Sequence, residues 1–221
     1  PSHIHFKQIC SGFYNKYSPL SNKPKKGEIK FSILFVKHIF GNQYELGLDY
    51  LQLLYQKPVH ILPILCLVSK ERSTGKSTFL KWLKAIFENN LTYLTNDSFG
   101  SQFNSDWANK LLICIDEVLF NKEELTERIK YLSTTNHNKM EAKGKDKIEV
   151  EFFGKFILCS NNEDNFIKID AAEERFWVRK ISKFKTEDTD MLVKLIKEIP
   201  AFLFFLNNRK LSSPRITRMW F

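Results

Sequence analysis

The sequence lacks the features that mark membrane and secreted proteins. Its apolar runs fall well short of the roughly 20 residues that a membrane-spanning helix needs, and its N-terminus shows no signal-peptide pattern. It has only four cysteines and no Cys-x-x-Cys pair. Three of the four lie inside apolar runs, where a thiol behaves as a small hydrophobic side chain. No internal repeat is visible. These absences predict a protein of a reducing, cytoplasmic compartment.

The composition is that of a globular protein. A length of 221 residues, with 43% hydrophobic and 27% charged residues, suits one good-sized domain with or without a small appendage. The net charge of +9 predicts a polyanionic partner, although a plain surface excess of lysine is the alternative. The chain has no starting methionine and stops abruptly at Phe221, so we expect it to be a fragment of a longer polypeptide.

Residues 62–78 predict a nucleotide-phosphate site. The apolar run 62–68 has no polar alternation, which is typical of a strand buried on both faces of a parallel sheet. The polar stretch 69–78 follows, and apolar residues then recur every four positions from Phe79 to Phe87, which predicts a helix that starts near Gly75. In such a strand, loop and helix, backbone N–H groups and the helix dipole converge on a bound polyphosphate.

The loop residues can be given individual roles. Lys76 is placed to reach the terminal phosphates and Ser77 to hold a magnesium ion, within an intact Thr-Gly-Lys-Ser-Thr core from Thr74 to Thr78. One position departs from the P-loop consensus, because Lys70 stands where a glycine is expected five residues before Gly75. A chance match in a basic loop is the alternative interpretation.

The remaining pattern predicts an α/β sandwich of the P-loop type with five short strands. We expect a polar arm over 1–28, a small helical unit over 29–58, an ATPase core over 59–185, and a helical C-terminal segment over 186–221 that begins a further region. The expected helices lie at 31–40, 44–56, 76–88, 122–132 and 186–208, with a short helix or loop at 97–107. The expected strands lie at 62–68, 91–94, 111–117, 156–159 and 176–178.

Two acids end the third predicted strand. Asp116 would contact magnesium through water and Glu117 would polarise the attacking water, as in a Walker B element. Acids at strand ends are common, but their place forty residues after Lys76 strengthens the interpretation. A phosphotransferase with a small acceptor would not need the second acid, so Glu117 favours hydrolysis.

Two further polar positions are candidates for the same chemistry. Asn161, which follows the fourth strand, could hydrogen-bond the γ-phosphate or the attacking water, although two neighbouring asparagines also form ordinary turns. Arg175, just before the fifth strand, could stabilise transition-state charge on a neighbouring subunit's nucleotide, and such a residue contributes about 10³ to 10⁵ in rate in the best cases. A plain salt bridge with Glu173 or Glu174 is the competing account.

A basic segment lies between the acid pair and Asn161. Residues 139–153 alternate in polarity around Gly144, which predicts a β-hairpin that turns near 143–146. It carries Lys139, Lys143, Lys145 and Lys147, whose close spacing suits contacts with DNA phosphates and little base reading. A merely solvated hairpin is the alternative.

In order along the chain, these motifs resemble the superfamily 3 helicases, a branch of the AAA+ ATPases, and within them the phage and plasmid primase-helicases of poxvirus-like type. The resemblance covers about residues 30–221 and rests on Thr-Gly-Lys-Ser-Thr, Ile-Asp-Glu, the basic hairpin, Ser-Asn-Asn and Glu-Arg-Phe-Trp-Val. It implies an AAA+-like fold and ATP and Mg²⁺ at the residues named above. It also implies a sensor at Asn161, a finger at Arg175 with Arg179 as fallback, and a hexameric ring around single-stranded DNA that is gripped by the hairpin.

Three functions remain open on the sequence alone. The first is an ATP-driven DNA helicase module of a phage, prophage or plasmid replication protein. The second is a P-loop phosphotransferase, against which Glu117 and the basic hairpin both argue. The third is an AAA+ ATPase that remodels a protein client, against which only the charge of the hairpin argues.

Overall fold

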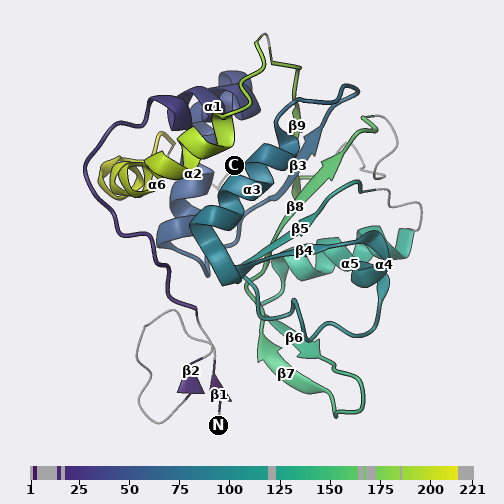
Figure 1. Cartoon of the computed structure of the whole chain (residues 1–221). Coiled ribbons are helices and arrows are strands. Elements are labelled where there is room, and N and C mark those ends of the chain that lie inside the picture. Colours follow the sequence, from purple (N-terminus) through teal and green to yellow (C-terminus); the bar gives the residue numbers. More distant parts are fainter. Residues whose placement is uncertain are drawn as a thin grey trace.

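The computed structural model describes residues 2–3, 14–15, 18–118, 123–163, 167, 173–184 and 186–213. Most of these residues form three layers, in which a parallel sheet lies between two groups of helices (Figure 1). The expected arm over 1–28 lies partly outside the described residues. Within it, Ser2–His3 (β1) and Tyr14–Asn15 (β2) pair as a short parallel ladder.

The central sheet has five strands, and every pairing in it is parallel. Its strands are Ile64–Val68 (β3), Leu91–Leu94 (β4), Leu112–Ile115 (β5), Lys155–Ser160 (β8) and Phe176–Lys180 (β9). Their order across the sheet is β4-β5-β8-β3-β9. All five strands predicted from the sequence are confirmed, and β3 is buried along its whole length, as its unbroken apolar run requires.

Side chains of the central strands alternate between two hydrophobic cores. In β3, Leu65 and Leu67 belong to one core, whereas Ile64, Cys66 and Val68 belong to the other. The first core lies under Lys30–Phe40 (α1), Tyr44–Gln56 (α2), Lys76–Phe87 (α3) and Met191–Asn208 (α6). The second core lies under Asn96–Gly100 (α4) and Glu123–Thr134 (α5). Helices therefore cover both faces of the sheet, as a buried parallel sheet demands.

The helices follow the sequence pattern closely. The helices α1 and α2 occupy the ranges expected for the small helical unit, and α3 begins one residue after Gly75. The C-terminal helix starts later than expected, at Met191 instead of 186, and continues through Pro200. This helix packs on α1, α2 and α3, so the helical unit and the C-terminal helix share one core.

The predicted hairpin is confirmed and projects beyond the sheet (Figure 1). His137–Met140 (β6) pairs antiparallel with Ile148–Glu151 (β7), and Gly144 lies at the tip with a φ of 72°. Asn104 anchors the hairpin because it exchanges hydrogen bonds with the Glu141 backbone and donates to the Lys139 carbonyl. The base of the hairpin is therefore fixed while its tip faces solvent.

Across the described part of the chain, no helix combines the length and the apolarity needed to cross a membrane.

Candidate functional site

The carboxyl ends of three neighbouring strands surround one pocket. Residues that follow β3, β5 and β8 meet there because the carboxyl ends of parallel strands lie at one edge of a sheet. The pocket has a volume of about 210 Å³ and is lined by Arg72, Ser73, Thr74, Gly75, Lys76, Ser77, Thr78, Asp116, Glu117 and Asn161. Every residue predicted to bind nucleotide or metal therefore lines it, together with both predicted acids and the predicted sensor.

Lys76 is a buried cation with neutral partners. The residue is only 7% exposed, and its Nζ donates to the hydroxyls of Ser69 and Thr74 and to Oδ1 of Asn161, the last at 2.9 Å. Within the described part of the chain no carboxylate forms an ion pair with it. Burial lowers the pKa of Lys76, while the charges of Asp116 and Glu163 act in the opposite direction. A buried ammonium without a paired anion is costly, so this position is suited to an anionic ligand.

The loop reaches its conformation without a glycine at position 70. Positive φ angles occur at Ser73 (56°) and Gly75 (91°), and not at Lys70, whose backbone N–H donates to Glu163 at 3.1 Å. A Cβ at Gly75 would lie 2.9 Å from a ring carbon of Phe184. Gly75 is therefore the loop residue that the backbone and the packing both require, and the departure at Lys70 leaves the strand, loop and helix intact.

The helical unit holds the loop from one side. Nε2 of His38 in α1 donates to the carbonyl of Thr74 at 3.0 Å, and the His38 ring stacks on Phe184 with centroids 3.6 Å apart. Burial lowers the pKa of His38, although the hydrogen bond to Thr74 opposes that shift. The neutral imidazole thus fixes the loop backbone. No sequence spacing signals this contact, because 36 residues separate the two partners.

The acid pair sits on a strained backbone. Glu117 has a φ of 55°, which is uncommon for a residue with a side chain and is one of the strained conformations found at active sites. Its N–H donates to Oδ1 of Asp116 at 3.0 Å, and its carbonyl accepts from the side chain of Asn96 at 3.2 Å. Both carboxylates are exposed towards the pocket. Asn96 was missed by the sequence interpretation, although its place just after β4 at the same edge of the sheet was a usable signal.

The strand order explains the position of Asn161. Because β8 lies between β3 and β5, the residue that follows β8 stands between the loop after β3 and the acids after β5. Asn161 contacts Lys76 on one side and shares the pocket with Glu117. Arg72 also lines the pocket, and the Ser69 hydroxyl accepts a hydrogen bond from Lys76. The sequence motifs assigned no role to either residue.

A second cavity adjoins the first across Gly75. It has a volume of about 200 Å³ and shares Ser73, Gly75 and Thr78 with the phosphate-sized pocket. Its other lining residues combine apolar and acidic side chains: Phe184, Glu187, Asp188 and Met191. The first cavity is polar and the second is partly apolar, and Gly75 lies between them.

The residues present fit a magnesium-bound triphosphate. Among the described residues, no three or more His, Cys, Asp or Glu side chains group together as a metal site. Magnesium does not require such a group, because it is held by one or two protein oxygens together with waters and substrate phosphates. Ser77 and Asp116 line the same pocket and could supply those oxygens, and the Lys76 ammonium beside them suits phosphate charge.

The two arginine candidates lie away from the pocket. Arg175 precedes β9, and its carbonyl accepts from Ile64 at the start of β3, about 13 Å along that strand from the loop. Its guanidinium pairs with Glu173 at 2.6 Å and 2.8 Å. Within one chain, Arg175 therefore forms the salt bridge that the sequence offered as its alternative role. Burial raises the pKa of Glu173, but the hydrogen bonds and charge of Arg175 bring it below its usual value overall.

Arg179 is held inside the chain. Its guanidinium donates to the Phe40 carbonyl and to Oε1 of Gln43, both at 2.6 Å. The first of these bonds satisfies a carbonyl at the C-terminal end of α1. Burial lowers its pKa. Arg179 is therefore tied to α1, whereas the Arg175 side chain, although paired with Glu173, is 36% exposed.

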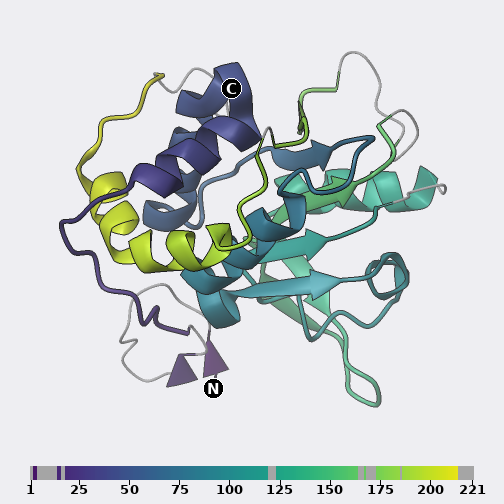
Figure 2. The ribbon, with the colours of Figure 1, turned by 45° about the horizontal axis from the view of Figure 1, so that its top comes forward.

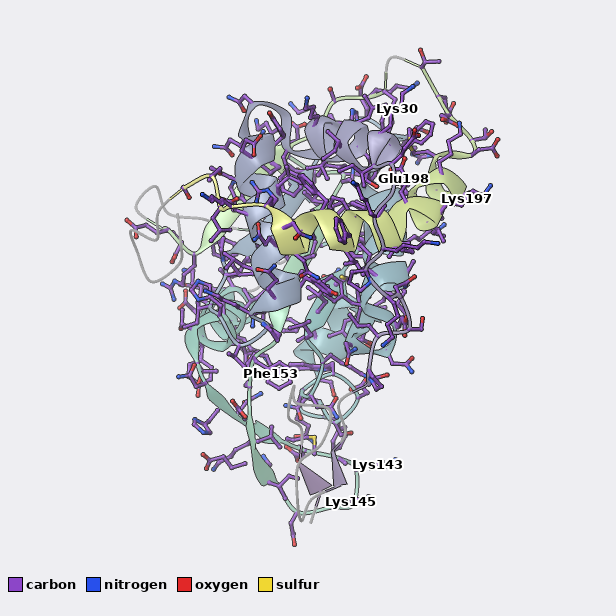
Figure 3. All side chains as sticks on the ribbon, turned by 90° about the vertical axis from the view of Figure 1, so that its left-hand side faces the viewer. Lys30, Lys143, Lys145, Phe153, Lys197 and Glu198 are labelled. Carbon is purple, nitrogen blue, oxygen red and sulfur yellow. The ribbon has the colours of Figure 1, made fainter. Side chains whose placement is uncertain are left out.

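The hairpin lysines are exposed, but the hairpin as a whole is not basic. Lys143 and Lys145 lie at the tip, at the opposite end of the molecule from Lys30 and Lys197 (Figure 3). Neither forms an ion pair with a described residue, whereas Lys147 pairs with Glu141 at 2.9 Å. From His137 to Glu151 four lysines are balanced by four acids. The tip therefore presents two lysines without such ion pairs, on a hairpin whose charges balance overall.

The fold and the loop geometry define an α/β domain of the P-loop type. The chain belongs to a family of unknown function, DUF5906, whose model matches residues 67–179. That span contains the loop, the acid pair, the hairpin, Asn161 and Arg175. No curated protein matches the chain significantly.

Solved structures share the fold. The apo structure of the NrS-1 C-terminal region (305–718) superposes with a TM-score of 0.79 at 22% identity, covering 90% of this chain and 51% of the other. Its A form gives a TM-score of 0.78 at the same identity and coverage. The chain thus spans about half the length of these structures, and the likeness establishes the five-stranded α/β fold.

Proposed function

We propose that this chain is an ATP-hydrolysing motor module of a mobile-element replication protein, which moves along single-stranded DNA as a helicase. The carrying observation is the buried Lys76 ammonium, which contacts only neutral acceptors while two exposed carboxylates and Asn161 line the same pocket. A phosphate-bearing substrate supplies the missing negative charge at this point. The likeness of the motif order to superfamily 3 helicases and the P-loop fold support the choice of nucleotide.

The polyphosphate occupies the pocket around Lys76, with loop N–H groups and the positive end of α3 directed at it. Magnesium, when bound through Ser77 and Asp116, neutralises phosphate charge. Glu117 accepts the proton of the attacking water, and Asn161 orients that water or the γ-phosphate. The strained backbone at Glu117, supported by Asn96, holds the carboxylate at the mouth of the pocket.

The nucleoside extends into the adjoining cavity. A nucleotide on this loop must leave the phosphate pocket past Gly75, and the cavity there presents Phe184 and Met191 to an apolar ring. His38 holds Phe184 against the loop, so the helical unit contributes to this wall. The base is bound mainly by packing, with Glu187 able to accept a hydrogen bond from an amino group.

The module acts as a ring, for which a hexamer is our proposal. Arg175 lies at the sheet edge opposite its own pocket, a position from which it can serve only a neighbouring subunit. To do so, the Arg175 guanidinium must break its ion pair with Glu173 and pair with the γ-phosphate bound to the neighbouring subunit. The hairpin tip, with Lys143 and Lys145, faces the central single strand.

ATP hydrolysis with and without single-stranded DNA tests the function. We expect the parent chain to hydrolyse ATP, with stimulation by single-stranded DNA of mixed sequence. Glu117→Gln should bind a fluorescent ATP analogue like the parent but hydrolyse at least about 100-fold more slowly, because a lost general base typically costs 10²–10⁴ in rate.

Three outcomes would contradict the proposal. Hydrolysis at the parent rate by Glu117→Gln would remove that residue as the base. Transfer of the γ-phosphate to a nucleoside, in place of water, would favour a phosphotransferase. ATPase activity that ignores DNA but responds to an unfolded protein would favour the remodelling ATPase.

A further inference from the structure

The excess positive charge of the chain lies outside its α/β core. Residues 59–190 contain 20 basic and 21 acidic side chains, so the net charge of +9 comes from the two ends of the sequence. Residues 18–29, here called the strap, bring part of this charge onto the surface of α6. The hairpin, by contrast, contributes no net charge.

The strap is fastened to the helical layer. Asn22 donates to the Ala85 carbonyl at 3.1 Å and Lys25 N–H donates to the Pro200 carbonyl at 3.0 Å. The strap therefore crosses the end of α3 and passes beside α6 before it enters α1 (Figures 1 and 2). The contacts that hold the strap come from its backbone groups and short polar side chains; the Ser21 N–H, for example, donates to Oε1 of Glu88 at 2.9 Å. The lysine ammoniums of the strap take no part in this fastening.

The strap lysines join further lysines on the neighbouring helices. Lys23, Lys25 and Lys26 are exposed and form no ion pair with any described residue. Lys30 and Lys197 are also exposed, and Figure 3 shows both near Glu198. We call these five residues the strap surface: Lys23, Lys25, Lys26, Lys30 and Lys197.

Two acids on the elements that follow the core are already engaged. Glu198 is 9% exposed and accepts from the N–H groups of Phe31 and Ser32 at 3.0 Å and 2.7 Å, so its charge is used at the start of α1. Asp188 pairs with Lys194 at 2.6 Å. Within the strap itself Glu28 is the single acid. Because like charges repel, clustering these lysines does not stabilise the fold. Folding therefore does not explain why they lie together.

We propose that the strap surface binds the phosphate backbone of a nucleic acid, as a second contact separate from the hairpin. Lysines are depleted at protein interfaces, whereas a cluster of lysines without arginine suits non-specific phosphate contacts. Residues 23–30 can span at most about 25 Å, a length that covers about seven phosphates at the roughly 3.4 Å axial rise per phosphate of one strand in a duplex. The strap surface thus binds nucleic acid of any sequence at the end of the molecule opposite the hairpin tip.

The salt dependence of DNA binding by the full chain, measured in the absence of ATP, tests this inference. The variant Lys25→Gln with Lys26→Gln is compared with the control Lys37→Gln with Lys57→Gln, which removes the same charge from exposed sites outside the strap and the hairpin. Fluorescence anisotropy is measured with a labelled 30-residue single strand of mixed sequence and with its duplex, over a series of salt concentrations. Circular dichroism first checks that both variants are folded.

The strap variant should bind about fivefold more weakly per lost contact to the single strand at 0.1 M salt, and about eightfold to the duplex. These values follow from slopes of about 0.7 and 0.9 per phosphate contact. The control should bind like the parent, and a form of DNA for which the strap variant loses at least one contact's worth of affinity is a ligand of the strap. Equal affinity and equal salt slope for strap variant and control would overturn the inference. So would unchanged DNA binding together with a changed oligomeric state in sedimentation, because the surface would then be a protein interface.

Discussion

Nζ of Lys76 donates a hydrogen bond of 2.9 Å to Oδ1 of Asn161, a residue 85 positions further along the chain. The contact exists because the sheet inserts β8 between the strand that precedes the loop and the strand that precedes the acids. It places an amide, a cation and two carboxylates at one pocket.

The first prediction separates binding from sensing at this pair. Lys76→Ala should weaken binding of an ATP analogue by about 100-fold or more and abolish turnover, because the phosphates lose a charged hydrogen-bond donor. Asn161→Ala should leave ADP binding unchanged and lower ATP turnover by about 10- to 100-fold, the loss expected for one hydrogen bond to a charged group. Titration calorimetry and a phosphate-release assay measure both. An Asn161→Ala variant with parent turnover would exclude a sensor role.

The second prediction concerns action between subunits. Arg175→Ala should bind ATP but not hydrolyse it, and mixing it with Glu117→Gln subunits should restore part of the activity. The mixed interface then joins an intact Glu117 to an intact Arg175. Glu173→Gln is the matched control, since it breaks the same ion pair without removing the guanidinium. Loss of activity in Glu173→Gln as well, with no recovery in verified mixed rings, would assign Arg175 to structure alone.

The third prediction tests the hairpin with changes of opposite sign. Replacing Lys143, Lys145 and Lys147 by alanine should weaken single-stranded DNA binding for all sequences alike and lower the salt slope by about 0.7 per lost contact. Glu149→Gln with Glu151→Gln, on the paired strand, should strengthen binding because it removes repulsion from phosphates. Both variants should keep basal ATPase, since the hairpin lies outside the sheet. Affinities that do not move in opposite directions would favour a protein client.

The fourth prediction is a pH dependence of stability that comes from Lys155. Its Nζ is buried beneath the carbonyls of Pro58 and Phe153, and burial lowers its pKa to about 7. Between about pH 7 and pH 10 the unfolded chain keeps a proton that the folded chain has released, so unfolding takes up a proton and stability rises with pH. Below pH 7 both states are protonated and the dependence disappears.

Lys155→Met should remove this dependence. The parent should gain stability relative to the variant by up to about 1.4 kcal/mol per pH unit above pH 7, measured by urea unfolding. Taking the difference between the two proteins cancels the contributions of Cys66, Cys114 and Cys159, whose pKa values are raised by burial. Parallel stability curves from pH 6 to pH 9 would show that Lys155 keeps its proton.

The local elements could be predicted from the sequence because each depends on a few adjacent residues. The unbroken apolar run of β3, the four-residue repeat of α3 and the glycine before it fixed the strand, loop and helix. Gly144 between alternating flanks fixed the hairpin in the same way. The polar residues at strand ends, Asp116, Glu117 and Asn161, could be assigned to one site because parallel strands end at one edge.

Contacts between distant segments were decided by the tertiary structure alone. The order of the strands placed Asn161 against Lys76, and no residue pattern encodes that order. The support of the loop by His38 and the passage of the strap beside α6 likewise depend on packing across the helical layer. Hydrophobic periodicity determines which face of an element is buried, whereas the neighbour that buries it is selected by the packing of the whole core.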